Sequence, residues 1–590
     1  MIIVPLKETT MEKIPGPKEI EKDISEFLSE KYGGAVRMIT PVVLPHADTA
    51  ADENTSPSDS TLDFDMTPEA LIGYLDQYII KQDQAKEVLA TKICTHFNRI
   101  QRVLDSPKAT DNIVGGIKNN VLMIGPTGVG KTYMIKLIAQ KIGVPFVKGD
   151  ATKFSETGYV GGDVEDLVRD LVREADDNIE LAQCGIIYID EIDKIAGSRR
   201  FAGADVSRTG VQRALLKPME ETEVDLKVPH DPVFMFQELE QFRKTGNREK
   251  RAVNTKNILF IMSGAFSELP EIIEKRLTKQ RIGFGARLKE TGDSSQTLAK
   301  IKSEDLVQYG FESEFIGRLP VRAIFERLTE PDLYQILKNP NNPIILGKKL
   351  DFAAYDIDAK FEDQTLVTLA HQAFDENTGA RGLVSAVENA LLTFERRLPS
   401  SSLKRFPITQ ATLDNPEPFF NLMTNGPENE QLQTDFDRLA DEELEMIRKY
   451  IRLNRDRLSG QVNLTLTESR INLAAKFYAK YPMDIDHIFI KMRAYYDETM
   501  KVELGFQKKH DIRIVFENDA VDMIMEILAD ASATQDDLQN RLGEDLALGF
   551  KLIREKTGKD RFYVTHQALL DPEKFITQLI KAELSDSTIS

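Results

Sequence analysis

The chain has 590 residues, of which 41% are hydrophobic and 29% charged, with a formal net charge of −19 and two cysteines. Its length predicts several domains, and two cysteines exclude a disulfide framework and a four-thiolate zinc site. The acidic balance argues against a partner bound mainly by neutralising phosphates, so a nucleic-acid partner is not expected. Without an apolar run near the roughly 18 residues of a membrane span, we expect a cytoplasmic protein with no membrane partner.

Residues 1–65 are poorly patterned, and the stretch 41–65 is rich in Pro, Ser, Asp, Asn and Thr. Such a composition buries too little apolar surface to order itself, so we expect a largely flexible linker. Ordered structure is expected to begin with a helix near Met66. Shortly after it, Ile79 and Ile80 could flank an adenine ring, although packing in a core is the commoner role of adjacent isoleucines.

The most informative stretch lies between an apolar run, 121–124, and a helical pattern, 133–142. It reads Gly125, Pro126, Thr127, Gly128, Val129, Gly130, Lys131, Thr132. A strand, a glycine-rich loop and a helix in this order are what a phosphate-binding P-loop requires. The glycines let backbone N–H groups surround a phosphate chain, Lys131 can reach the β- and γ-phosphates, and the Thr132 hydroxyl can ligate Mg²⁺. The sequence therefore predicts that the chain binds a nucleoside triphosphate.

A loop with two glycines, Gly158-Tyr159-Val160-Gly161, follows the next predicted strand. An aromatic and a β-branched residue between glycines suggest a mobile loop with an apolar tip. The alternative is an aromatic side chain tucked into the core, and the residues alone leave both interpretations open.

Further along, the apolar run 185–189 ends in Asp190 and Glu191. Ligands of parallel sheets bind at the carboxyl ends of the strands, where these carboxylates would lie. Asp190 can hold Mg²⁺ through its water shell, and Glu191 can orient and deprotonate an attacking water molecule. The alternative is that the two residues only cap the next helix. Alternating strands and helices over 66–325 indicate an α/β sheet domain, followed over 326–425 by a mostly helical segment.

The ordered set of motifs resembles the ATPases of the AAA+ class and, within it, the ClpX unfoldases of the Clp protease, over about Met66 to Phe419. The resemblance rests on Gly125–Thr132, Gly158–Gly161, Ile186–Glu191, Asp205–Gln212, Ile282–Phe284, Glu314–Pro320 and Thr378–Gly382. It implies an AAA+ P-loop NTPase with a large domain, 66–325, whose parallel sheet is flanked by helices, and a small domain, 326–425. It also implies a homo-hexameric ring that hydrolyses ATP with Mg²⁺ at subunit interfaces and threads polypeptides through its pore. No protease active site is expected in this chain.

The resemblance also implies roles for single residues. Lys131, Asp190 and Glu191 would be catalytic, and Arg318 looks like the arginine finger that reaches the γ-phosphate of a neighbouring subunit. Arg381 looks like the second sensor, which reports the nucleotide state to the small domain.

The same resemblance assigns three loops. Tyr159 and Val160 look like the pore loop that grips substrate, and Arg199 with Arg200 would belong to a second pore loop. Ile282-Gly283-Phe284 resembles the tripeptide with which ClpX docks on the ClpP peptidase, so a ClpP-type partner is expected. The alternative for this tripeptide is an ordinary packed surface loop.

Three departures from the family are visible. The zinc-binding amino-terminal domain has no counterpart, so no zinc is expected and substrate capture by that route is in doubt. Lys81 stands where the family usually has glycine beside the adenine pocket. The segment 222–254 is longer than expected, which puts substrate-tag preference in doubt.

Residues 426–590 exceed the length of the family and are expected to form a helical α+β extension. Phe361 to Gln364 resembles Phe516 to Asp519, and Arg405 to Phe419 resembles Arg561 to Phe575, at offsets of 155 to 156 residues. This pattern suggests a degenerate duplicate of the small domain. Asp537 occupies the place of Arg381 in the second copy, and a carboxylate cannot pair with a phosphate. The alternative is convergent composition without duplication.

Two other functions remain open at this point. One is a remodelling chaperone of the AAA+ class that works without a peptidase. The other, which the acidic balance and the lack of a nucleic-acid-binding module disfavour, is an AAA+ motor directed to nucleic acid.

Overall fold

The structure is a computed structural model that describes residues 64–105, 118–154, 162–197, 206–226, 252–281, 294–425, 430–530 and 532–586. A five-stranded parallel sheet with the strand order β2-β3-β6-β1-β7 occupies the first half of these residues. Its strands are β1 (Val121–Ile124), β2 (Phe146–Asp150), β3 (Ile186–Asp190), β6 (Leu259–Gly264) and β7 (Val321–Ile324). The sheet confirms the α/β prediction.

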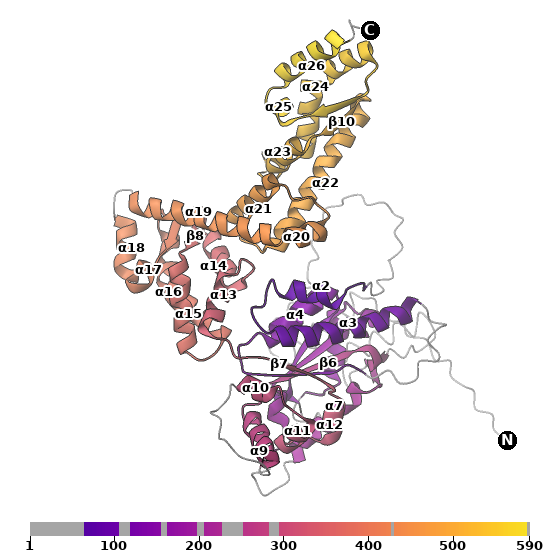
Figure 1. Ribbon diagram of the computed structural model, residues 1–590, viewed down its shortest axis with the longest axis vertical. Helices are drawn as coiled ribbons and strands as arrows, with labels where there is room; N and C mark the ends of the chain where they lie inside the picture. Colours follow the sequence, from indigo (N-terminus) through magenta and orange to yellow (C-terminus); the bar gives the residue numbers. More distant parts are fainter. Residues whose placement is uncertain are drawn as a thin grey trace, which may run out of the picture. The chain divides into compact units, whose positions relative to one another are not determined.

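Helices cover both faces of this sheet (Figure 1). On one face, Val121, Met123 and Tyr188 pack in one core with α3 and α4. On the other face, the alternate residues Leu122 and Ile124 pack in a second core with α5, α7, α9 and α11. Because both faces are buried, the central strands β1, β3 and β6 are almost wholly apolar, as expected for a parallel sheet, whereas the edge strands β2 and β7 include Lys148 and Arg322.

The bounds of the remaining elements in this half are as follows. The helices are α2 (Pro68–Leu75), α3 (Asp83–Asp105), α4 (Lys131–Ile142), α5 (Asp166–Glu174), α6 (Ile179–Ala182), α7 (Val206–Met219), α9 (Leu269–Arg281), α10 (Ser294–Leu298), α11 (Ser303–Tyr309) and α12 (Ser313–Gly317). The strands β4 (Glu223–Asp225) and β5 (Ala252–Asn254) pair antiparallel. The helix expected near Met66 is α2, which Thr67 caps by accepting a hydrogen bond from the backbone of Ala70.

The next part of the chain is mostly helical and contains one parallel strand pair, β8 (Asp358–Phe361) with β9 (Arg405–Ile408). Its helices are α13 (Glu330–Lys338), α14 (Pro343–Ala353), α15 (Asp363–Asp375), α16 (Ala380–Arg397), α17 (Gln410–Asp414) and α18 (Pro416–Asn425). Apart from Leu346 of α14, its buried apolar side chains belong to the same core as α3 and α4.

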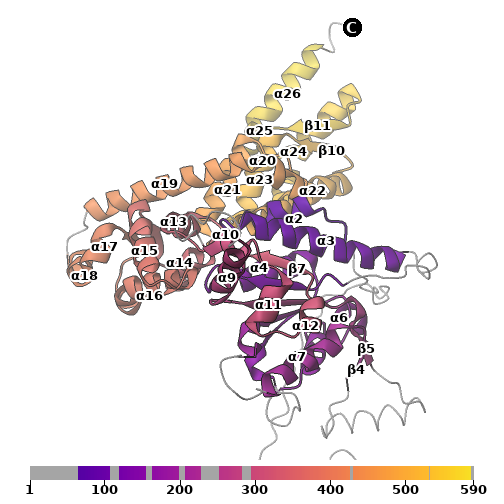
Figure 2. The same cartoon turned by 60° about the horizontal axis from the view of Figure 1, so that its bottom comes forward.

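The carboxyl-terminal extension is helical around a second parallel pair, β10 (Arg513–Phe516) with β11 (Arg561–Val564). The helices are α19 (Glu430–Leu453), α20 (Arg455–Val462), α21 (Glu468–Lys480), α22 (Ile485–His510), α23 (Asn518–Ala529), α24 (Gln535–Thr557), α25 (His566–Leu570) and α26 (Pro572–Asp586). Figure 2 shows α23 to α26 gathered around β10 and β11. Apart from Leu346 of α14, the fully buried members of this core all come from the extension.

The order of elements from β8 to α18 recurs from β10 to α26: strand, two helices, strand, short helix, helix. The buried ring pair Phe394–Phe406 of the first set has a counterpart in Phe550–Phe562, with centroids 5.0 and 4.4 Å apart. Both pairs join the second helix to the second strand of their set, at the offset of 156 residues. This agreement supports the hypothesis of a duplicated small domain.

Among the described helices, none is both long enough and apolar enough to cross a membrane.

Candidate nucleotide site

The P-loop connects the carboxyl end of β1 to α4, as its motif predicts. Gly130, which precedes the first residue of α4, has a φ of 91°, in the left-handed region that glycine tolerates. Lys131 is buried, and its Nζ donates to the carbonyl oxygens of Gly125 and Pro126, both at 2.7 Å. Burial lowers the pKa of this lysine to about 8. The ammonium therefore lies inside the loop that would surround the phosphates.

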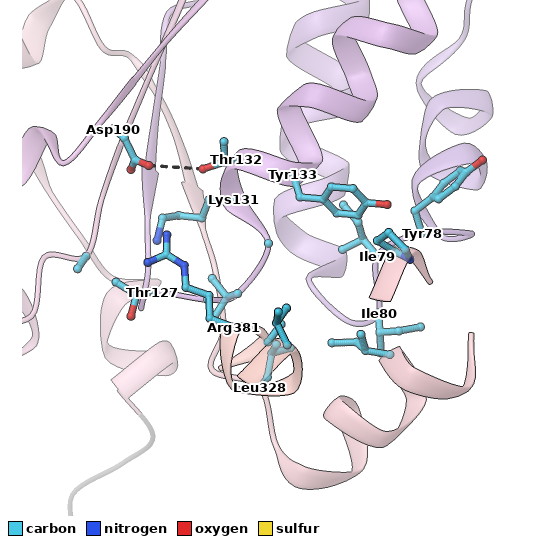
Figure 3. Close-up of a pocket in the computed structure, with 18 of the residues that line it drawn as sticks. Tyr78, Ile79, Ile80, Thr127, Lys131, Thr132, Tyr133, Asp190, Leu328 and Arg381 are labelled. Atoms are coloured by element: carbon cyan, nitrogen blue, oxygen red, sulfur yellow. Dashed lines mark hydrogen bonds between the residues drawn. The ribbon is translucent and has the colours of Figure 1, made fainter. Parts of the chain in front are cut away.

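Asp190 lies at the carboxyl end of β3, inside a network of hydrogen bonds. Its Oδ1 accepts from Ser263 Oγ at 2.6 Å, and Lys148 Nζ lies 3.1 Å from Oδ2. Burial alone would raise the pKa of Asp190, but these partners outweigh it and hold the pKa below its ordinary value. Thr132 Oγ1 lies 3.5 Å from Asp190 Oδ2 (Figure 3). An ionised carboxylate beside a hydroxyl is a donor set that suits the water shell of Mg²⁺.

The buried Tyr188 is hydrogen-bonded to two members of this network. Its hydroxyl lies 2.6 Å from Ser263 Oγ and 3.0 Å from Thr132 Oγ1. Burial raises the pKa of Tyr188 to about 12, so the hydroxyl remains protonated at neutral pH. The phenol thus fixes Thr132 and Ser263 relative to each other across two strands and the P-loop helix.

Glu191 follows Asp190 in the left-handed backbone conformation, with a φ of 57°. This conformation costs a residue other than glycine about 1–2 kcal/mol, and such strain tends to occur at functional sites. Its backbone N–H donates to Asp190 Oδ1 at 3.1 Å, and its side chain is exposed at the edge of the pocket. A carboxylate held in this place can accept a proton from water.

A pocket of about 580 Å³ adjoins the P-loop. Its apolar wall consists of Tyr78, Ile79, Ile80, Val129, Leu328, Ile336, Pro343, Ile344 and Val384. Ile79 and Ile80 line the pocket, and Ile79 also belongs to the core; their contact with an adenine base stays a prediction. Figure 3 shows Tyr78, Ile79 and Ile80 away from Lys131 and Asp190. One end of the pocket is therefore apolar, as an adenine base requires, and the other is polar and charged.

The start of α16 closes the pocket at the P-loop. The backbone N–H of Ala380 donates to the Gly128 carbonyl at 2.8 Å. A Cβ on Gly128 would lie 2.1 Å from the Thr378 carbonyl oxygen, so only glycine permits this approach. Arg381 lines the pocket and points toward Lys131 in Figure 3. The second-sensor candidate and the P-loop are thus brought together by backbone contact.

Arg318 lies at the opposite end of the sheet. Val321 of β7 pairs with Val121 of β1 in parallel, so Arg318 precedes the strands whose far ends carry the P-loop. Four residues of strand rise about 13 Å, so Arg318 is at least on the order of that distance from its own P-loop. Its guanidinium is half-exposed and pairs with Glu220 Oε1 at 2.5 Å.

Lys81 has a φ of 62°, which explains why glycine suits this position. Its Nζ donates to the Arg327 carbonyl at 2.9 Å and to Asp332 Oδ2 at 3.1 Å. The lysine therefore ties the segment beside the pocket to the start of α13, a contact that glycine could not make.

Several predicted residues lie outside the described part of the chain, so their positions are not compared with the predictions. They are Tyr159, Val160, Arg199, Arg200, Ile282, Gly283 and Phe284.

No sequence motif assigns a role to Lys148, Tyr188 and Ser263, which surround Asp190 and Thr132, or to Asn339 and Asn342, which line the pocket. Tyr188 and Ser263 carried a weak signal, because each is a polar residue in an otherwise apolar strand. Asn339 and Asn342 carried none, since nothing in the local sequence shows which wall a helix–helix turn will face.

Comparison with known proteins agrees with this geometry. The family model of the AAA domain (Cdc48 subfamily) matches residues 117–322. The ATP-dependent Clp protease ATP-binding subunit ClpX of Treponema denticola is 41% identical over 338 residues, which are 57% of this chain and 78% of that protein. The subunit of the same name from Borrelia duttonii is 40% identical over 353 residues, 59% of this chain and 79% of that protein. With its AAA domain, its P-loop site and this degree of identity, the chain is an ATPase that belongs to the ClpX family.

Proposed function

We propose that the chain forms a homo-hexameric ring that hydrolyses Mg²⁺–ATP at subunit interfaces and threads polypeptides through its pore into a ClpP-type peptidase. The observation that carries this proposal is the identity of 41% to a protein named as the ATP-binding subunit of the Clp protease. The position of Arg318 supports the ring, because an arginine at the far end of the sheet serves a neighbour's site and not its own.

Within each site, Lys131 and the backbone N–H groups of the P-loop would hold the phosphates, and Thr132 with Asp190 would hold Mg²⁺ through oxygen ligands. Bound Mg²⁺ neutralises charge on the phosphates. Glu191 accepts the proton of the attacking water molecule. Arg381 acts as the second sensor, through which a change of the bound nucleotide affects α16. Ile79 and Ile80 contact the adenine base.

Tyr159→Ala tests the threading role. We expect the variant to hydrolyse ATP at nearly the wild-type rate and to lose unfolding of a tagged fluorescent protein, because the loop is proposed to grip substrate and lies outside the nucleotide motifs. Loss of fluorescence, with and without a ClpP-type peptidase, is the measurement. Unfolding that persists in Tyr159→Ala contradicts the pore assignment. Unfolding by the wild type without stimulation of the peptidase favours a remodelling chaperone instead.

A further inference from the structure

The carboxyl-terminal extension reaches the apolar wall of the nucleotide pocket at the start of α22. Tyr78, which lines the pocket, donates from its hydroxyl to Asp486 Oδ2 at 3.3 Å. Asp486 is 5% exposed, and its Oδ1 lies 3.6 Å from Arg457 Nη1 of α20. Burial, together with the carboxylate of Asp486, raises the pKa of Tyr78 far above its ordinary value, so the hydroxyl remains a donor.

A second contact involves the turn 339–342 between α13 and α14. Asn339 and Asn342, at its two ends, line the pocket. Asn339 Nδ2 donates to the Gln77 carbonyl at 2.7 Å, next to Tyr78. The turn therefore joins the segment that carries Ile79 and Ile80 to the helices of the small domain.

The extension holds the middle of this turn. The backbone N–H of Ile485, the first residue of α22, donates to Asn341 Oδ1 at 2.9 Å. Asn341 Nδ2 donates to the Tyr450 hydroxyl at 3.2 Å. The hydroxyl of Tyr478 donates to the Pro340 carbonyl at 3.1 Å. Both Asn341 and Tyr478 are buried, so these groups lose their partners if the extension moves away.

The extension has a hydrophobic core of its own, drawn almost wholly from residues beyond 446. Its contacts with Tyr78 and the turn meet the pocket on the side where the base would lie. Loss of these contacts would change the spacing of that wall, and by reciprocity a bound nucleotide would favour the arrangement in which the contacts are made.

We propose that Asp486 and the start of α22 position the adenine wall of the nucleotide pocket, so that the extension sets the affinity of this ATPase for nucleotide. These are positioning residues, which act through Tyr78 and the turn 339–342 and do not touch the phosphates. The proposal rests on the ATPase activity alone and is independent of threading, so its failure leaves the proposed unfolding function untouched.

The test compares Asp486→Ala, Tyr78→Phe and the double variant in the full-length chain. Each single variant removes the hydrogen bond between Tyr78 and Asp486, and Asp486→Ala also removes the carboxylate beside Arg457. We expect each to raise the KM for ATP and the Kd for a fluorescent ADP analogue by roughly three- to tenfold. The kcat stays within about twofold of the wild type. The double variant should weaken binding no further than Asp486→Ala alone, because Tyr78 acts on the pocket through its contact with Asp486.

Two controls separate positioning from general damage. Asp486→Asn keeps an oxygen that accepts from Tyr78 and should restore nearly wild-type affinity. Asp522→Ala removes the carboxylate that pairs with Arg470 at 2.7 Å inside the extension and should leave the KM unchanged. In the wild-type chain, ADP should slow amide hydrogen exchange at the start of α22, a measurement that needs no variant. Three results would each overturn the proposal. They are an unchanged KM in Asp486→Ala, an equal rise of the KM in Asp522→Ala, and a rate of amide hydrogen exchange at the start of α22 that is the same with and without ADP.

Discussion

At the scale of single residues, the nucleotide site depends on groups whose protonation is set by burial. Asp190 is held ionised by Ser263 and Lys148, and Tyr188 is held neutral by its buried position. Within this site, Lys131 is the residue whose protonation state changes near physiological pH, because burial lowers its pKa to about 8. A bound phosphate chain would favour the ammonium form again.

This difference predicts proton uptake on nucleotide binding. In the free protein the Lys131 pKa is about 8, and phosphate raises it in the complex. Above pH 8, binding must therefore take up a proton, and affinity should fall as pH rises, by at most tenfold per pH unit. Calorimetry of ADP binding at pH 9, in buffers of different ionisation enthalpy, measures the uptake.

At pH 7 the lysine is protonated in both states, so the same titration should show little uptake by Lys131 and serves as the control. Burial also lowers the pKa of Lys118 to about 8. Lys118 lies just before the amino end of β1, where its Nζ donates to backbone carbonyl oxygens, so it should not contribute to the proton uptake. Binding at pH 9 without proton uptake would contradict the assignment of Lys131 to the phosphates.

At the scale of elements, the contact between the P-loop and the start of α16 makes the pocket a joint product of two parts of the chain. Gly379 has a φ of 65°, and a Cβ there would lie 2.7 Å from the Gly128 carbonyl oxygen. The backbones meet closely enough that neither glycine can be replaced without moving α16. Arg381, two residues on, moves with it.

Gly379→Ala should therefore weaken nucleotide binding by roughly tenfold, because strain of about 1–2 kcal/mol is relieved by displacing α16 from the P-loop. The measurement is the Kd for ADP together with thermal unfolding. Gly347→Ala in α14 is the matched control, since a Cβ at Gly347 meets nothing within 4 Å. That change should stabilise the helix by about 0.5–1 kcal/mol and leave the Kd for ADP unchanged. Equal Kd values for the two variants would show that the close approach has no role in binding.

At the scale of the whole molecule, the sheet places the P-loop and Arg318 at opposite ends. In the proposed ring, each subunit would hold one phosphate site and offer Arg318 to the site of its neighbour. Such a shared site would couple ATP hydrolysis to assembly of the ring. The extension is also connected to the nucleotide pocket, because its contacts with Tyr78 and the turn 339–342 link a separate hydrophobic core to the pocket lining.

Mixing two inactive variants tests the shared site. Arg318→Ala keeps its own Glu191 but offers no arginine, whereas Glu191→Gln offers the arginine but lacks the base. Each alone should lose at least about 100-fold in ATP hydrolysis. Mixed after dissociation, they should regain a measurable fraction of the wild-type rate, because some interfaces then combine both intact residues. Phosphate release checks this, with each variant mixed with itself as the control. No gain on mixing would place Arg318 outside the neighbour's site.

The sequence was sufficient to locate short motifs that are contiguous along the chain and to predict the fold class. The P-loop from Gly125 to Thr132 and the pair Asp190–Glu191 are short segments at the ends of apolar strands, and parallel strands bring such ends to one edge of a sheet. The α/β class and the parallel sheet were also predictable from the sequence, because continuous apolar strands require a sheet that is covered on both faces.

Only the tertiary structure decided which distant residues meet at that edge. Tyr188, Ser263 and Lys148 join Asp190 because β2, β3 and β6 are neighbours, and strand order cannot be read from any one strand. The contact of Asp486 with Tyr78 spans 408 residues and depends on how three parts of the chain pack. Local pattern determines where a strand or loop begins and what chemistry it carries, whereas long-range packing determines which of those chemistries share one pocket.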